Sequence, residues 1–134
     1  IANASLLDEG TAAAEAMSLL FDVRTRDQKK NNVMKFFVSE EILPQTLSVL
    51  QTRATPLNIE LVVGNHEAFD FSTEFFGAIL QYPGKFGQVN DYASFITKAK
   101  ECLRKYLSPT EVKLPSALLE HVRRWASIVS RMTC

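Results

Sequence analysis

Three short apolar segments, separated by helix-like stretches, constrain the fold of this chain more than any other feature of its sequence. They are Met34–Val38, Ile59–Val63 and Phe75–Tyr82, and none of them alternates regularly between apolar and polar residues. A short apolar run without such alternation is typical of a strand that is covered on both faces. The sequence therefore predicts an α/β fold in which a parallel sheet lies between layers of helices.

Other apolar residues recur at helical spacing. Helices are expected over residues 1–24, 41–53, 91–106 and 115–132. The first helix has two possible starts, a capping box over Ser5–Asp8 or the Gly10–Thr11 step, and Pro44 falls in the first turn of the second helix, where its missing N–H costs little. The polar stretch 24–32 is expected to be a solvated connector.

Length and charge exclude several classes of protein. The 134 residues suit one domain, and 15 basic residues balanced by 15 acidic ones argue against a nucleic-acid-binding surface. No apolar run reaches the length of a membrane span, and Cys102 and Cys134 have neither disulfide-scaffold nor metal-ligand spacing. The sequence begins at Ile1 without a signal-peptide pattern, so we expect an intracellular segment whose true beginning lies upstream.

The residues that could carry chemistry are few. A helix start at Gly10-Thr11 could offer backbone N–H groups and a hydroxyl to a small anion, although helix initiation alone also explains this step. His66 follows the second apolar run, at a strand end where α/β sheets place ligands, but a lone loop histidine is more often a surface residue. The carboxylate pairs Asp8-Glu9 and Glu40-Glu41 suit first helical turns, and Pro83–Gly87 is a glycine-bearing turn with one lysine.

Four segments in the same order resemble one enzyme family. They are the opening stretch Ala2–Met17 (ANASLLDEGTAAAEAM), Phe37–Ser39, Pro44–Ala54 and Phe76–Pro83 (FGAILQYP). Together they resemble the amino-terminal half of the glycine decarboxylase P-protein, from residue 1 to about residue 100. One departure is Leu43, where many relatives have a histidine before Pro-Gln-Thr.

The resemblance implies a fold, a cofactor and partners. The fold would be part of the aspartate-aminotransferase-like (fold type I) large domain, with the three strands side by side in the order third, first, second. The parent enzyme would decarboxylate glycine with pyridoxal phosphate and pass the aminomethyl group to the lipoyl H-protein. Gly10 and Thr11 align with a helix start beside the cofactor phosphate and are the candidate cofactor-binding residues. No catalytic or metal-binding residue is assigned, because the Schiff-base lysine belongs to the other half of the P-protein, and this chain is expected to bind no cofactor by itself.

Residues 101–134 differ from the part before them. Residues 1–100 hold nine basic and twelve acidic residues, whereas 101–134 hold six and three. We expect a helical basic tail without a recognised counterpart in the family, whether a divergent end, a fused sequence or a misread frame. Its apolar residues are expected to pack over the sheet; they are Leu118, Val122, Trp125, Ile128, Val129 and Met132.

Three functions remain open from the sequence. The first is a segment of the P-protein that is not catalytic alone, partnered by the other half of that protein and the H-protein, in the bacterial cytoplasm or the mitochondrial matrix. The second is an interaction module that docks on another chain or on a second copy of itself. The third is a free-standing binder of a small anion at Gly10-Thr11.

Overall fold

The computed structural model describes residues 8–106 and 127–130, and side chains are described for residues 8–99 and 101. Its centre is a four-stranded sheet in the order β2-β1-β3-β4. Strands β1 (Lys35–Ser39), β2 (Glu60–Gly64) and β3 (Gly77–Gln81) are parallel to one another, and β4 (Ser127–Ser130) is antiparallel to β3. The α/β fold and the strand order third, first, second are both confirmed.

The register brings the carboxyl ends of the parallel strands together. Ser39, the last residue of β1, lies opposite Gly64, the last residue of β2. On its other side β1 pairs Val38 with Ile79 of β3. The loops that leave these strands therefore start from one edge of the sheet, which we call the carboxyl edge.

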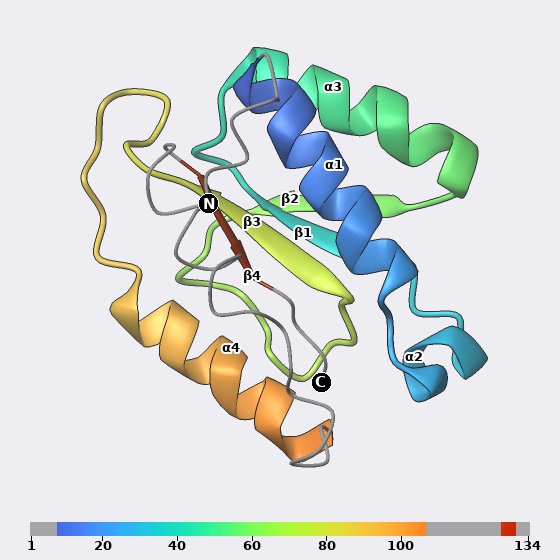
Figure 1. The fold of residues 1–134 in the computed structure, drawn as a ribbon. Helices are drawn as coiled ribbons and strands as arrows, with labels where there is room; N and C mark the ends of the chain where they lie inside the picture. Colours follow the sequence, from blue (N-terminus) through green and yellow to red (C-terminus); the bar gives the residue numbers. More distant parts are fainter. Residues whose placement is uncertain (1–7, 107–126, 131–134) are drawn as a thin grey trace, which may run out of the picture.

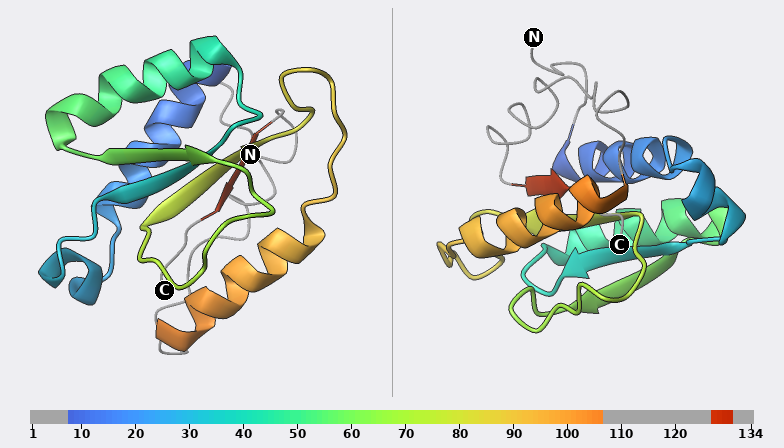
Figure 2. Two further views of the ribbon diagram at one scale, coloured as in Figure 1. Left: turned by 180° about the vertical axis from the view of Figure 1, so that it is seen from behind. Right: turned by 90° about the horizontal axis from the view of Figure 1, so that it is seen from below.

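Helices cover both faces of the sheet (Figure 1). Helices α1 (Glu9–Asp22) and α3 (Pro44–Ala54) lie side by side on one face, and α4 (Ala93–Tyr106) lies across the other. Figure 2 shows from two further sides that the sheet lies between these helices. Among the described residues, no helix is both long enough and apolar enough to cross a bilayer.

The face under α1 and α3 holds the larger core. Its buried side chains come from both helices, from β1 and β3 and from the connecting segments; they include Met17, Leu20, Phe36, Val38, Leu50, Phe76 and Ile79. Gly77 lies at its centre, where a Cβ atom would come within 2.8 Å of Phe36 Cε2 and 2.9 Å of Leu20 Cδ1. Only glycine therefore lets β3 approach α1 and β1 this closely.

The face under α4 is built mainly from aromatic rings. Phe37 of β1 lies 4.5 Å from Phe69, 6.4 Å from Phe75 and 6.1 Å from Phe95, measured between ring centroids. Phe69 belongs to the irregular segment between β2 and β3, which has no helix or strand of its own. Part of the core on this face thus comes from a loop.

The structure corrects several expected elements. The polar connector 24–32 contains a short helix, α2 (Arg26–Lys30), begun by a capping box in which Thr25 and Gln28 exchange side-chain and backbone hydrogen bonds. A 3₁₀ turn, η1 (Thr55–Leu57), follows α3. Both are too short to show an apolar period, which explains why hydrophobic spacing did not predict them.

The expected helix over 115–132 is wrong at its end. Residues Ser127–Ser130 form β4, with Val129 opposite Ile79 of β3. Two β-branched residues flanked by serines fit a strand, and pairing satisfies backbone groups along the open side of β3. The other part of that prediction, including Leu118, Val122 and Trp125, lies outside the described residues.

Candidate functional site at the carboxyl edge of the sheet

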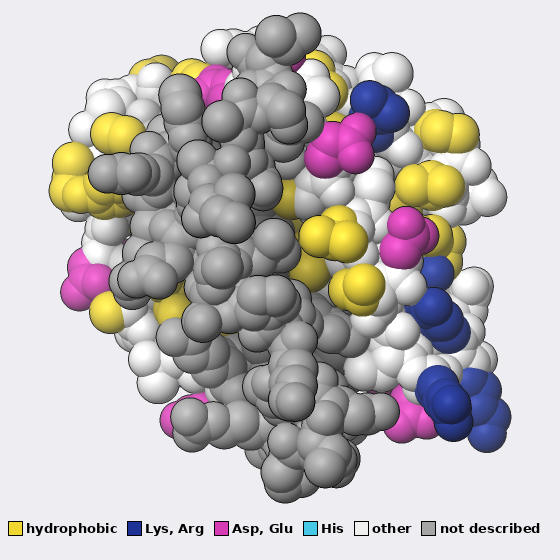
Figure 3. Space-filling view, in the orientation of Figure 1, with side chains coloured by type: hydrophobic (Ala, Val, Ile, Leu, Met, Phe, Trp, Pro, Cys, Tyr) yellow, Lys and Arg dark blue, Asp and Glu magenta, His cyan; other side chains and the backbone are white. Residues whose placement is uncertain are grey.

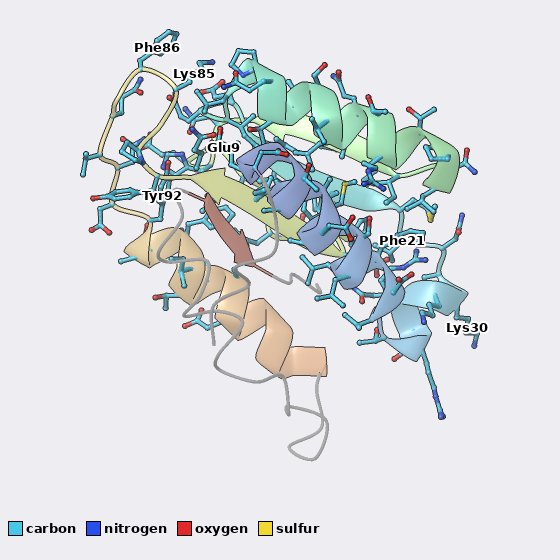
Figure 4. All side chains as sticks on the ribbon, turned by 45° about the horizontal axis from the view of Figure 1, so that its top comes forward. Glu9, Phe21, Lys30, Lys85, Phe86 and Tyr92 are labelled. Carbon is cyan, nitrogen blue, oxygen red and sulfur yellow. The ribbon has the colours of Figure 1, made fainter. Side chains whose placement is uncertain are left out.

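The carboxyl edge gathers the loops after β1, β2 and β3 and the starts of α1 and α3. Ligands of open α/β sheets bind outside such an edge, so the residues here are the first candidates for function. The Thr46 hydroxyl of α3 donates a 3.4 Å hydrogen bond to Oε1 of Glu9, which joins the two helix starts. Figure 4 shows Glu9, Lys85 and Tyr92 at this same end of the molecule.

The start of α1 is closed by the chain's own carboxylate. Asp8 is the N-cap: its Oδ1 accepts a 2.7 Å hydrogen bond from the Thr11 backbone N–H, and its Oδ2 accepts a 2.8 Å bond from the Thr11 hydroxyl. The two hydrogen bonds from Thr11 lower the pKa of the Asp8 carboxyl below its ordinary value of 3.8. An anion arriving here would meet a negative charge that already uses the Thr11 donors. Helix α1 therefore begins at Glu9, with Asp8 as its cap, and not at Gly10-Thr11. Ser5, the other expected cap, lies outside the described residues.

Gly10 has a packing role in the structure. It is buried where α1 meets α3, and a Cβ atom on it would lie 3.2 Å from Cγ2 of Val49 and 3.3 Å from Oδ1 of Asp8. The absence of a side chain thus lets α1 approach α3 and lets Asp8 reach the helix start. The assignment of Gly10 and Thr11 to a cofactor stays a prediction, and this geometry supplies a structural reason for both residues.

A buried polar network that hydrophobic patterning did not reveal joins the loops of the carboxyl edge. Gln81, the last residue of β3, accepts a 2.8 Å hydrogen bond at Oε1 from the Leu43 backbone N–H. Its backbone oxygen accepts a 3.0 Å bond from the Tyr92 hydroxyl, just before α4. Buried Ser39 accepts a 3.2 Å bond at Oγ from the backbone N–H of Glu41. Gln81 in the FGAILQYP run is the one sequence signal for this network, because a buried glutamine side chain is expected to have a hydrogen-bond partner.

The loop after β3 is tied to the loop after β1. Lys85 donates from its backbone N–H to the Glu41 oxygen at 2.8 Å and from Nζ to the Glu40 oxygen at 2.6 Å. Oε2 of Glu41 is buried and has no hydrogen-bond partner among the described residues, and it would lie 2.9 Å from a Cβ atom on Gly84. The Lys85 ammonium is therefore held against the backbone of the loop after β1.

His66 lies in the loop after β2, on the side of the sheet that α4 covers. Its ring is 4.7 Å from the Tyr92 ring, in an edge-on arrangement. It borders a cavity of about 90 Å³ together with Asp91, Lys98 and the aromatic residues of the loop. A volume of that size holds water or a small ion and not a cofactor or a substrate of ordinary size.

The described start of α1 does not fit the phosphate of pyridoxal phosphate. The carboxyl edge carries four carboxylates (Asp8, Glu9, Glu40 and Glu41), and the helix start expected beside a phosphate is occupied by one of them. A phosphate requires free N–H donors or cations, and at the start of α1 both Thr11 donors are already bound by Asp8. Within residues 8–99 no group of histidine, cysteine, aspartate and glutamate side chains has metal-binding geometry either.

Comparison with known proteins places the chain among relatives of much greater length. The family model described as "Glycine cleavage system P-protein" matches residues 1–112. A glycine dehydrogenase (decarboxylating) from Flavobacterium johnsoniae is 73% identical over 129 residues, which is 96% of this chain and 14% of that protein. Proteins of the same name from Christiangramia forsetii and Bacteroides thetaiotaomicron are 66% identical over 75% of the chain and 46% identical over 95% of it.

These matches revise the expectation for the last part of the chain. The chain spans 14% of the length of the Flavobacterium protein and 13% of that of the Bacteroides protein. Both alignments extend well past residue 100, because they cover 96% and 95% of the chain. The stretch after residue 100 therefore has a counterpart in these relatives, which the expectation of an unmatched tail did not foresee.

Proposed function

The chain belongs to the glycine cleavage system P-protein family, and from that premise we propose that it is a scaffold segment of an enzyme that decarboxylates glycine and passes the aminomethyl group to the lipoyl H-protein. The proposal is supported by the identity of 73% with a relative named for glycine decarboxylation. That enzyme would act in glycine catabolism as an oxidoreductase, in the cytoplasm of a bacterium, since the matched relatives are bacterial.

Pyridoxal phosphate would be held by another part of the parent protein. Bound there, it supplies the electron sink that decarboxylation of an amino acid requires. The segment contributes the sheet, the closed helix start at Asp8 and the network around Gln81, which together fix the position of the carboxyl edge. This division of labour is supported by the acidic character of the edge and by Lys85, whose Nζ donates to the Glu40 backbone oxygen.

A chimera tests the proposed function. The 134 residues of this chain replace the aligned segment of the Flavobacterium protein, and release of carbon dioxide from carboxyl-labelled glycine is measured with pyridoxal phosphate and lipoyl H-protein. We expect the chimera to retain activity within about tenfold of the parent, because the two segments share most of their sequence. A folded chimera that binds the cofactor and releases no label would contradict the proposal.

A substitution in the same chimera tests the scaffold role. Gln81→Leu keeps the approximate size of the side chain and removes the acceptor for the Leu43 N–H. We expect decarboxylation to fall and the melting temperature to fall with it, because a buried donor loses its partner. Thr52→Val is the matched control: its hydroxyl donates to Ser48 on the exposed side of α3, away from the carboxyl edge. Loss of activity without any loss of stability in Gln81→Leu would indicate a direct catalytic part and contradict a purely structural one.

A further inference from the structure

The loop between β3 and α4 exposes the most accessible large apolar side chains described in the molecule. Phe86 is 79% exposed, Val89 68% and Tyr82 42%. Figure 3 shows hydrophobic side chains together at the edge of the molecule where this loop lies, and Figure 4 shows Phe86 directed away from the body of the protein at the loop's tip. We call residues 82–89 the apolar loop. Single exposed apolar residues are common on surfaces, but three within eight residues of one loop mark a surface that binds something.

The apolar loop is held in one conformation by hydrogen bonds. Within it, the Gly87 N–H donates to the Gly84 oxygen at 2.8 Å and the Gly84 N–H to the Gln88 oxygen at 2.9 Å. The Gln88 side-chain oxygen accepts a further bond of 3.1 Å from the Phe86 N–H. Gly87 has a φ of 81°, in the left-handed region that glycine adopts without strain.

Two further bonds attach the apolar loop to the rest of the fold. Both come from Lys85, which binds the backbone oxygens of Glu40 and Glu41 in the loop after β1. The ordering entropy of the loop has therefore already been lost before any partner arrives. A pre-ordered loop that presents a phenyl ring to water binds more tightly than a loop that must first be ordered.

We propose that the apolar loop is the surface by which this segment docks on the remaining polypeptide of the full-length family protein, with Phe86 entering an apolar pocket there. The inference rests on the proposed function. The chain spans 14% of the Flavobacterium relative, so about six sevenths of such a protein lie outside it. The loop also leaves from the carboxyl edge, where the described residues include no metal-binding group and border a cavity of only about 90 Å³.

The charge around the ring specifies the pocket further. The Lys85 ammonium lies 5.2 Å from the centre of the Phe86 ring and is fixed by Glu40. A pocket that takes the ring therefore also meets a cation at its rim, and we expect aromatic or acidic side chains there.

Site-specific crosslinking in the chimera described above tests the inference. A photoreactive benzoylphenylalanine replaces Phe86 in one protein and Leu57 in a matched one; Leu57 is also apolar and exposed but lies in η1, away from the apolar loop. We expect residue 86 to crosslink to peptides from outside the 134 residues in most of the protein, and residue 57 to crosslink at least tenfold less. The inference is overturned if residue 86 gives no crosslinked peptide, or if it crosslinks only within this segment or to the same segment of a second copy.

The same result is checked without a crosslinker. Phe86→Ser leaves the melting temperature of the isolated chain nearly unchanged, because the ring is 79% exposed there and its contact with the Lys85 ammonium is weak. The same variant lowers the melting temperature of the chimera by several degrees. Phe86→Leu, which keeps an apolar side chain, restores much of that loss. Equal melting temperatures for wild type and Phe86→Ser in the chimera contradict docking. An active chimera without crosslinks overturns the docking inference and leaves the proposed function intact. A crosslinked but inactive chimera supports docking and contradicts the proposed function.

Discussion

The two faces of the sheet are packed in different ways. The face under α1 and α3 is covered by two helices whose buried residues recur at regular spacing. Its fully buried aromatic rings, Phe36 and Phe76, come from β1 and the residue before β3. The face under α4 has a single helix, and Phe69 and Phe71 of the β2–β3 loop complete its core. A core built from regular elements tolerates little change, whereas a core completed by a loop can adjust by moving the loop.

The largest difference is expected between two phenylalanines. Phe76→Ala removes a fully buried ring that contacts Phe21 and Phe36, and it is expected to lower the free energy of unfolding by about 3–5 kcal/mol. Phe69→Ala removes a half-buried ring on the loop side, with an expected loss of about 1–2 kcal/mol. Urea unfolding of the two variants measures both. Equal losses would show that the loop-built face is as rigid as the other.

Two strand glycines give the next largest effect. Gly77→Ala places a methyl group within 3 Å of both Phe36 and Leu20, and overpacking of this kind costs about 1–3 kcal/mol. Gly64→Ala is its control on the α4 side, where the nearest atom would be Cε2 of Phe37 at an ordinary 3.5 Å. We expect the stability of Gly64→Ala to stay within about 0.5 kcal/mol of wild type. A larger decrease of the melting temperature in Gly64→Ala than in Gly77→Ala would contradict the conclusion that the face under α1 and α3 is the more tightly packed one.

A smaller effect is expected from two aspartates that accept hydrogen bonds from nearby residues, Asp8 and Asp70. Asp8 caps α1 on the first side, and Asp70 accepts bonds from Ser72 and Thr73 in the loop on the other. These hydrogen bonds lower both carboxyl pKa values below 3.8, so their stabilisation is complete above that pH and is lost as the pH falls through the lower pKa of the folded state.

Asn variants separate the two aspartates. Asp8→Asn is expected to lower the melting temperature at pH 7, because the start of α1 loses a negatively charged cap. The variant is also expected to flatten the decrease of the melting temperature as the pH falls from roughly 5 to 2, because the carboxyl group that would be protonated is absent. Asp70→Asn changes hydrogen exchange in its own loop and leaves the global melt nearly unchanged. An unaltered pH profile in Asp8→Asn would mean that this carboxylate does not stabilise the folded state.

The smallest effect is expected from exposed charges. Arg53 and Glu15 form an ion pair of 3.4 Å between α3 and α1, with side chains 53% and 51% exposed. Arg53→Gln is expected to change stability by less than about 0.5 kcal/mol, because solvent and salt screen such pairs. On the other face, Lys98→Gln removes a cation 5.9 Å from the Phe71 ring, with a similarly small effect. Both variants are measured by urea unfolding in about 0.15 M salt, where charges are screened over a Debye length of about 8 Å. A loss of stability above about 1 kcal/mol in either variant would contradict this ranking.

Much of the regular fold could be predicted from the sequence. The three apolar runs gave the parallel strands, and Pro44 correctly indicated the first turn of α3. Helix α2 was not predicted, because it depends on a local capping box and not on an apolar period. Strand β4 was not predicted, because it depends on pairing with the open edge of β3.

The candidate site was less accessible to sequence reasoning. The sequence placed a possible helix start at Gly10-Thr11, whereas α1 begins at Glu9 and is capped by Asp8. The buried network of Gln81 with Leu43 and Tyr92 joins residues far apart in the chain, and such pairs depend on the strand order. The family resemblance supplied that order, and the match to residues 1–112 confirms the family.

We propose that this segment builds the scaffold of a glycine-decarboxylating enzyme and does not hold the cofactor itself. The most direct test is retention of pyridoxal phosphate by the isolated chain after equimolar mixing and gel filtration, compared with the chimera under the same conditions. We expect bound cofactor in the chimera, seen as absorbance at about 410–430 nm, and none with the isolated chain. Stoichiometric retention by the isolated chain, lost in a Thr11→Val variant, would contradict it.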